Sequence, residues 1–119
     1  MTANEIIEQI LGWELHKWSP TSSLAYMCQV KADLIHYVME NCSCTDQEKE
    51  AYQQNVNNLT LKYGALRDYA TDHQEDFPMR HLSLLKQLNY KTMKHRYEGT
   101  AYWGDINMYL GQIRKVGRL

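Results

Sequence analysis

The chain has 119 residues, of which 44% are hydrophobic and 23% are charged, and its formal net charge at pH 7 is -1. This length fits one compact domain, and this composition is that of an ordinary globular protein and argues against intrinsic disorder. No stretch approaches the roughly 18 apolar residues of a membrane-spanning helix, and the first residues lack the basic and apolar segments of an export signal. We therefore expect residues 1–119 to form one soluble helical domain.

The small net charge conceals an uneven distribution of charged residues. Residues 1–77 contain 12 Asp/Glu and 5 Lys/Arg, whereas residues 78–119 contain 2 Asp/Glu and 8 Lys/Arg. The net charge of residues 1–77 is therefore -7, and that of residues 78–119 is +6. Such an asymmetry predicts a docking surface for an oppositely charged partner, either a nucleic acid or a protein.

The three cysteines indicate the compartment and exclude the common metal motifs. Cys28, Cys42 and Cys44 form neither an even disulfide framework nor a C-x-x-C pair, which is typical of a reducing compartment. We expect a cytoplasmic protein, and for a viral protein the host cytoplasm. His36 could join Cys42 and Cys44 at a metal, but a fourth ligand is missing. We predict no metal site and no cofactor.

Two helices are predicted before residue 45. Thr2 and Glu5 have the spacing of a capping box, and the apolar residues that follow share one broad helical face, namely Ile6, Ile7, Ile10, Leu11, Trp13 and Trp18. This helix should end at Ser19-Pro20. A second helix should run from Ser22 until the stretch 41–44 breaks its apolar pattern.

Thr45 and Glu48 form the clearest capping box of the sequence and predict the start of a third helix. Its apolar residues alternate in steps of four and three, which defines a heptad-like seam of Tyr52, Val56, Leu59, Tyr63, Leu66 and Ala70. The seam should be buried, either against the second helix or across the axis of a homodimer. We favour packing within the chain, because every helix here must bury its apolar face.

The basic C-terminal third predicts two more helices. Pro78 fits the first turn of a helix that continues to Tyr97 and ends at Gly99. A helix-turn-helix would need more residues between Leu88 and Tyr90, so we predict one continuous or kinked helix there. Thr100 should cap a last helix that extends to Val116. Because no segment alternates with period two, the fold class is all-α, a compact bundle of about five helices without a sheet.

The candidate binding residues come from these last two helices. Arg80, Lys91 and Lys94 fall in one stripe of a helical wheel, bordered by Tyr90 and Tyr97, and the last helix carries similar outward cations. Cations at this spacing can meet successive phosphates, and tyrosine rings can stack on unpaired bases. The predicted partner-binding or nucleic-acid-binding residues are Arg80, Lys91, Lys94, Arg96, Arg114, Arg118, Tyr90 and Tyr97. The alternative is a cationic face that meets only solvent.

No nucleophile, base pair or phosphate loop is visible, so we do not expect an enzyme. The sequence favours a non-enzymatic interaction or regulatory protein, an adaptor or inhibitor that docks a macromolecular partner by shape and charge. The alternative is a DNA- or RNA-binding protein that uses the basic C-terminal helices. Acidic residues of the first three helices would instead suit a basic protein surface, namely Glu5, Glu8, Asp33, Glu40, Glu50 and Asp68.

Overall fold

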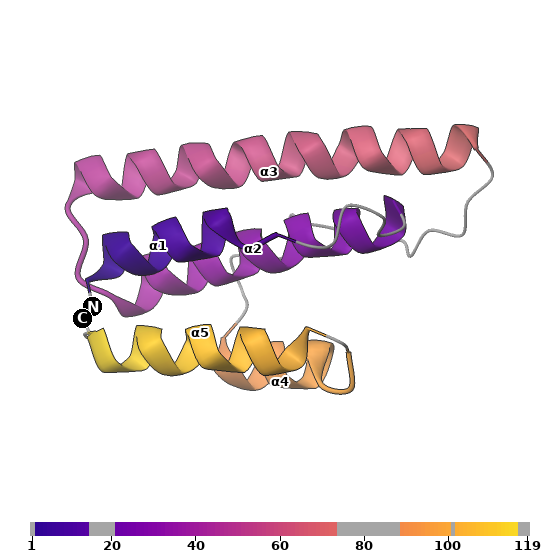
Figure 1. Ribbon diagram of the computed structural model, residues 1–119. Coiled ribbons are helices and arrows are strands. Elements are labelled where there is room, and N and C mark those ends of the chain that lie inside the picture. Colours follow the sequence, from indigo (N-terminus) through magenta and orange to yellow (C-terminus); the bar gives the residue numbers. More distant parts are fainter. Residues whose placement is uncertain (1, 15–20, 74–88, 101, 117–119) are drawn as a thin grey trace.

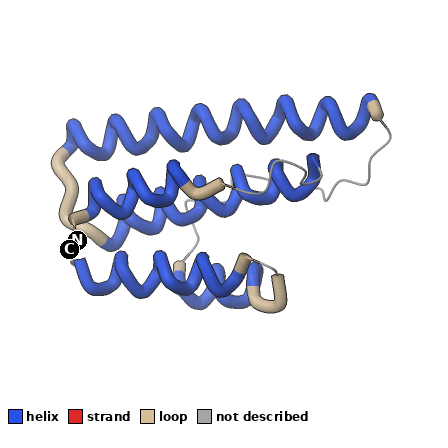
Figure 2. The backbone as a smooth tube through the Cα atoms, in the orientation of Figure 1, coloured by secondary structure: helices blue, strands red, loops and turns tan. Residues whose placement is uncertain are grey.

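The protein is described by a computed structural model that covers residues 2–14, 21–73, 89–100 and 102–116. Over these ranges it contains five α-helices and no strand, which confirms the all-α prediction (Figures 1 and 2). The helices are α1 (Ala3–Gly12), α2 (Thr21–Asn41), α3 (Asp46–Asp72), α4 (Tyr90–Tyr97) and α5 (Trp103–Val116).

The helices pack in layers around α2. Figure 1 shows α3, the longest helix, on one side of α1 and α2, with α4 and α5 on the other side. Helix α2 contacts α1, α3 and α5, and α4 packs against α5. One hydrophobic cluster contains residues from all five helices, including Ile10, Leu34, Val56, Met93 and Leu110. Within the described ranges, no helix combines the length and the apolar character needed to cross a membrane.

Helix α1 begins as predicted and ends earlier than predicted. The Thr2 hydroxyl accepts a hydrogen bond from the Glu5 amide at 3.2 Å, which satisfies one of the unpaired amides of the first turn. The expected continuation beyond Trp13 is wrong, because Trp13 adopts an extended conformation directly after Gly12. Its ring lies 5.9 Å from the rings of Tyr102 and Tyr109, so aromatic packing replaces the last helical turn. Residues 15–20 lie outside the described ranges.

Helices α2 and α3 form an antiparallel pair. The Glu48 amide donates to the Thr45 hydroxyl at 3.1 Å and the Thr45 amide donates to the Glu48 carboxylate at 3.0 Å, so the predicted capping box is confirmed. The seam of α3 is buried within the chain, with Tyr52, Val56, Tyr63 and Ala70 at most 5% exposed and Leu59 and Leu66 packed beside them. Packing against α2 therefore occupies the residues that a homodimer through this seam would need.

Helix α4 differs from the predicted long helix. Asn89 is extended, and its side-chain oxygen accepts hydrogen bonds from the Thr92 amide and hydroxyl. A strong N-cap residue thus starts a new helix at Tyr90, and a continuous helix through Asn89 is wrong. Residues 78–88 of the predicted helix lie outside the described ranges. Gly99, with a φ of 87°, follows the end of α4 as predicted.

Thr100 does not have its predicted role at the start of α5. Its hydroxyl donates to the Tyr97 carbonyl at 2.7 Å, so it closes the end of α4 instead. The first bond of α5 is donated by the Ile106 amide to the Tyr102 carbonyl, which places Tyr102 at the N-cap position. The middle of α5 is connected to α1 by a long hydrogen bond of 3.5 Å, which the Tyr109 hydroxyl donates to the Gln9 carbonyl.

The buried seam yields a stability prediction. Val56→Asp should lower the free energy of unfolding by about 3 to 5 kcal/mol, because it places an unpaired carboxylate between α2 and α3. The matched control is Leu61→Asp on the outer side of the same helix, where the side chain is 73% exposed. That variant should stay within about 0.5 kcal/mol of the original chain in urea unfolding. Equal stabilities of the two variants would contradict the intrachain packing of the seam.

Candidate docking surface of α4 and α5

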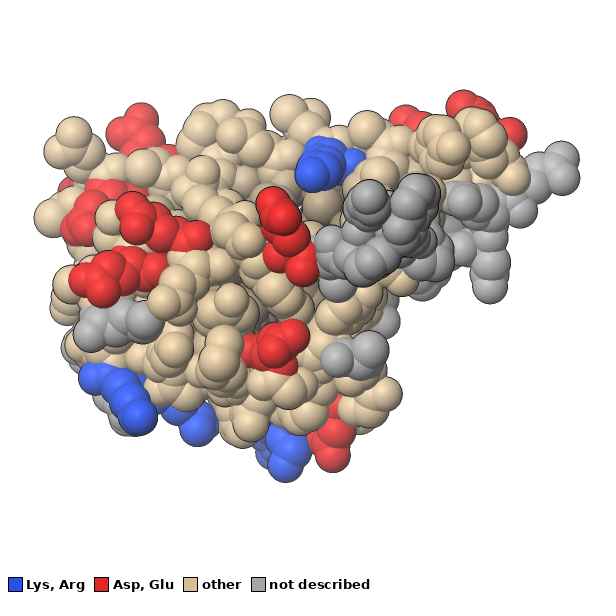
Figure 3. Space-filling model, in the orientation of Figure 1, with Lys and Arg blue, Asp and Glu red and all other residues tan. Residues whose placement is uncertain are grey.

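The exposed cations of the C-terminal helices lie together on the outer side of the bundle. Lys91 and Lys94 on α4 and Arg114 and Lys115 on α5 are all exposed, and we refer to these four residues as the cationic surface. Figure 3 shows Lys and Arg side chains along the edge formed by α4 and α5, opposite α3. The predicted site residues Arg80 and Arg118 lie outside the described ranges.

A stacked pair joins the two helices beneath this surface. The Arg114 guanidinium carbon lies 3.7 Å from the centre of the Tyr90 ring, and the Tyr90 hydroxyl donates to the Asn107 side-chain oxygen at 3.4 Å. Tyr90 is half-buried and packs against the hydrophobic core. The contact is a cation–π interaction, and it holds the guanidinium plane in a defined position between α4 and α5.

The helix dipoles explain the positions of some of these cations but not of all four. Arg114 and Lys115 occupy the last turn of α5, and Lys94 occupies the last turn of α4, where the negative end of the helix dipole favours positive charge. Lys91 is in the first turn of α4, which contains no acidic residue. A cation at this end is disfavoured by about 0.3 to 1 kcal/mol, so helix stability does not account for Lys91.

Two of the predicted binding residues, Tyr97 and Arg96, do not belong to the cationic surface. Tyr97 is completely buried, and its ring packs against Tyr26 at 5.5 Å, so the prediction that it borders the surface is wrong. The Arg96 side chain is only 20% exposed and points to Asp33, with 4.0 Å between guanidinium nitrogen and carboxylate oxygen. Arg96 is therefore turned toward α2 rather than toward a partner. The prediction of Asp33 as part of an acidic face is also wrong, because its side chain is fully buried.

Aromatic residues close the space between α1, α2 and α5. Trp13 packs against Tyr102 and Tyr109, and Tyr26 packs against both Tyr102 and Tyr97. This cluster accounts for four of the nine tyrosines, and the hydroxyls of Tyr26 and Tyr102 suit their half-buried positions. Helical wheels did not identify this cluster, since its members come from separate helices and from the ends of helices. The excess of tyrosine was the only sequence signal for it.

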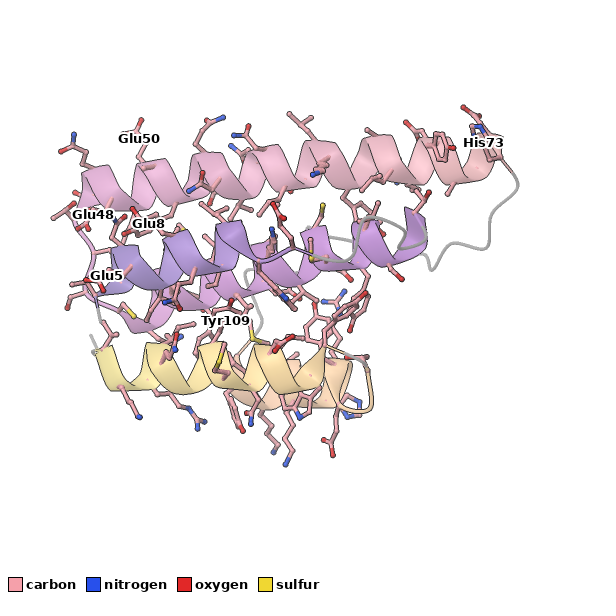
Figure 4. The ribbon with its side chains drawn as sticks, viewed as in Figure 1. Glu5, Glu8, Glu48, Glu50, His73 and Tyr109 are labelled. Atoms are coloured by element: carbon pink, nitrogen blue, oxygen red, sulfur yellow. The ribbon has the colours of Figure 1, made fainter. Side chains whose placement is uncertain are left out.

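Acidic residues gather at the end of the bundle where α1 and α3 begin. Figure 4 shows Glu5 and Glu8 on α1 near Glu48 on α3, with Glu50 on the outer side of α3. Glu48 belongs to the capping box, and the Thr2 hydroxyl donates to Glu5 at 3.3 Å. The Asn4 side chain donates to Glu8 at 3.5 Å. Glu5 and Glu48 lie in the first turns of α1 and α3, where a carboxylate stabilises the helix dipole, so these two residues have structural roles, whereas Glu8 and Glu50 lie beyond the first turns.

Tyr52 connects these two helix starts. Its hydroxyl lies within hydrogen-bonding distance of the Asn4 side-chain oxygen, at 3.4 Å, and of the Glu48 carboxylate, at 3.5 Å. Burial raises the pKa of Tyr52 to about 12, with a further contribution from the negative charge of Glu48. The phenol therefore stays protonated in the folded protein at pH values where an exposed tyrosine ionises.

The thiols have environments that oppose reactivity, and Lys31 is engaged in a structural hydrogen bond. Burial raises the pKa of Cys28, Cys42 and Cys44, which disfavours the thiolate needed for nucleophilic attack or metal binding. Burial lowers the pKa of Lys31, whose ammonium donates to the Leu11 carbonyl at 2.9 Å and so caps the end of α1. Among the residues that the structure describes, no three His, Cys, Asp or Glu side chains are grouped to hold a metal ion.

Comparison of the sequence with protein-family models, with curated proteins and with solved structures finds no match in any of the three.

The inward position of Arg96 yields a prediction that separates it from its neighbours on α4. Arg96→Gln should lower the free energy of unfolding by about 2 kcal/mol or more, because the buried Asp33 carboxylate loses its nearby cation. Lys91→Gln removes a charge of the same sign from the exposed side of the same helix and should raise stability by about 0.3 to 1 kcal/mol, because it takes a cation away from a helix N-terminus. Urea unfolding of both variants at neutral pH measures the difference. An unchanged free energy of unfolding in Arg96→Gln would contradict the inward position of Arg96 and make it a candidate for the cationic surface again.

The raised pKa of Tyr52 yields a pH prediction. In the unfolded chain the phenol ionises near its ordinary pKa of 10.0, whereas the folded protein retains the proton up to about pH 12. The stability contributed by Tyr52 is therefore complete below pH 10 and is lost as the pH rises to 12. Tyr52→Phe should reduce this alkaline loss by about 2 kcal/mol in urea unfolding at several pH values. Tyr69→Phe, on the exposed side of α3, is the control, and identical profiles for the two variants would contradict the assignment.

Proposed function

We propose that this chain is a non-enzymatic helical interaction protein that docks an anionic macromolecular partner through the cationic surface of α4 and α5. The observation that carries the proposal is the exposed position of Lys91 in the first turn of α4, where helix electrostatics oppose a cation. A cation at a position where it does not stabilise its own helix fits a role in contacts outside the chain.

The acidic end of the bundle is the weaker candidate for docking. Glu5 and Glu48 are engaged in the first turns of α1 and α3, and Asp33 is buried. The positions of these three residues follow from the stability of the fold. Lys91 on the cationic surface has no such explanation, and this difference favours the cationic surface as the docking face.

The chemistry of the described interior supports a binding role rather than catalysis. The three thiols have raised pKa values, and Lys31, the buried amine, is hydrogen-bonded to the end of a helix. Thiols with raised pKa values are poor nucleophiles near neutral pH, and the hydrogen bond of Lys31 gives that side chain a structural role. The exposed cations supply charge and hydrogen-bond donors, which are suited to recognising carboxylates or phosphates.

The proposal predicts a charge-dependent interaction that two substitutions remove. The double variant Lys91→Glu with Lys94→Glu should weaken binding to polyanions by at least about tenfold, because two attractive contacts become repulsive. The probes are polyglutamate and a fluorescent single-stranded oligonucleotide, measured by anisotropy at low salt. Binding should weaken as salt rises, and thermal unfolding should be unchanged because both side chains are exposed.

The matched control is the double variant Lys62→Glu with Arg67→Glu. Both residues are exposed on α3, on the other side of α2, so reversing two charges there should leave binding unchanged. Failure of both polyanions to bind at low salt would overturn the proposal. Binding of polylysine instead, lost in the variant Glu5→Lys with Glu8→Lys, would transfer the docking face to the acidic end.

A further inference from the structure

We propose that the partner of the cationic surface is a single-stranded nucleic acid, and that one of its bases stacks on the outer face of the Arg114 guanidinium. This inference rests on the proposed function and names the class of its partner. It depends on a layered arrangement of core, Tyr90 and Arg114, and on the lysines that surround it.

The Arg114 guanidinium rests on the ring of Tyr90. Tyr90 packs against the hydrophobic core, and its hydroxyl is held by Asn107 at 3.4 Å. The guanidinium carbon of Arg114 lies 3.7 Å above the ring, so one face of the guanidinium plane is covered. Holding an arginine in this way reduces the conformational entropy lost when a ligand binds to it.

The other face of the guanidinium is accessible. Arg114 is exposed, and its described ring contact is with Tyr90. A flat group can therefore approach the guanidinium from solvent on the side away from Tyr90. Unpaired bases stack on arginine planes and on aromatic rings in this way.

The charge around the stack is positive. Lys91 and Lys94 on α4 and Lys115 on α5 are exposed and follow Tyr90 and Arg114 closely in sequence. A base that stacks on Arg114 would bring its flanking phosphates to these ammonium groups. Phosphate contacts from lysine supply most of the sequence-independent affinity for nucleic acids. In a duplex the bases stack on each other, so this platform selects a single strand.

Little apolar surface is exposed on the described residues of α4 and α5. Met108 is the one large hydrophobic side chain that is exposed on the described residues of α4 and α5. Protein interfaces usually contain a desolvated apolar centre with aromatic or aliphatic anchors, and this surface offers a single methionine. A surface of cations around a stacked ring fits a phosphate chain with bases better than an acidic protein.

The experiment uses the full chain and three fluorescent probes in anisotropy titrations. The probes are a thymidine oligonucleotide of about twelve residues, the same phosphate chain with abasic sites, and polyglutamate. The test variant is Arg114→Lys, which keeps the positive charge and removes the guanidinium plane. Urea unfolding of this variant verifies that the fold is retained.

The oligonucleotide should bind the original chain about tenfold more tightly than the abasic chain, and Arg114→Lys should remove most of this difference. Affinity for the oligonucleotide should fall about 20-fold between roughly 50 and 200 mM salt, as expected for three phosphate contacts, and the salt dependence should be the same in the variant. The same oligonucleotide in duplex form should bind more weakly than the single strand.

Equal binding of the oligonucleotide and the abasic chain would overturn base stacking and show that the surface recognises negative charge without contacting bases. Binding of polyglutamate with no binding of the oligonucleotide at low salt would overturn the nucleic-acid partner and retain the proposed function. Absence of binding to all three probes at low salt would overturn both. An equal loss of affinity for all three probes in Arg114→Lys would overturn base stacking, because it would show that this residue acts without contacting a base.

Discussion

Helix α2 is enclosed by its neighbours, so its polar side chains must find partners inside the protein. Residues 27–38 are all buried, and they include Gln29, Lys31, Asp33 and His36. Burying a charged group without a partner costs several kcal/mol, so the positions of neighbouring elements are tied to these side chains. The ammonium of Lys31 is bonded to the end of α1, and Asp33 faces Arg96 of α4. The central helix thus positions α1 and α4 through polar contacts as well as through apolar packing.

The orientation of the cationic surface follows from this constraint. Helix α4 has only eight residues, which is too short to be stable alone, so its rotation about its own axis is set by what it buries. Met93 and Tyr97 enter the core, and Arg96 turns toward Asp33. With these three side chains directed inward, Lys91 and Lys94 are left on the exposed side. The contact of Tyr90 with Arg114 then joins this side of α4 to α5.

The sequence predicted the features that depend on local chemistry and on regular spacing. The capping box of Thr45 and Glu48 and the buried seam of α3 were predicted correctly, because a cap acts within one turn and a heptad pattern repeats over many residues. The predictions for Asp33 and Arg96 were wrong because a helical wheel assigns charged residues to solvent, and the prediction for Tyr97 was wrong because its ring is buried against Tyr26 of α2. Only the tertiary structure shows that α2 is enclosed on several sides and that a charged pair lies inside.

Of the candidate site, the exposure of Lys91, Lys94 and Arg114 was predicted from the sequence. The contact of Arg114 with Tyr90 was not predicted, because it joins residues 24 positions apart and leaves no local sequence pattern.

The net charge of -1 does not prevent the cationic surface from attracting a polyanion. The acidic residues of α3 lie on the other side of α2 from α4 and α5. Exposed charges separated by more than the Debye length, about 8 Å at physiological ionic strength, are largely screened from each other, so these residues act only weakly on a ligand at α4 and α5. The nearer acidic residues, Glu98 and Asp105, are located beside the turn that joins the two helices. Tyr90 begins α4 and Arg114 is close to the end of α5, so the stacked pair lies toward the opposite end of this antiparallel pair. Glu5 and Glu8 of α1 lie at the end of the bundle where α5 also ends (Figures 1 and 4), so these carboxylates partly oppose the attraction of Lys91, Lys94 and Lys115 for an anionic ligand at the stacked pair.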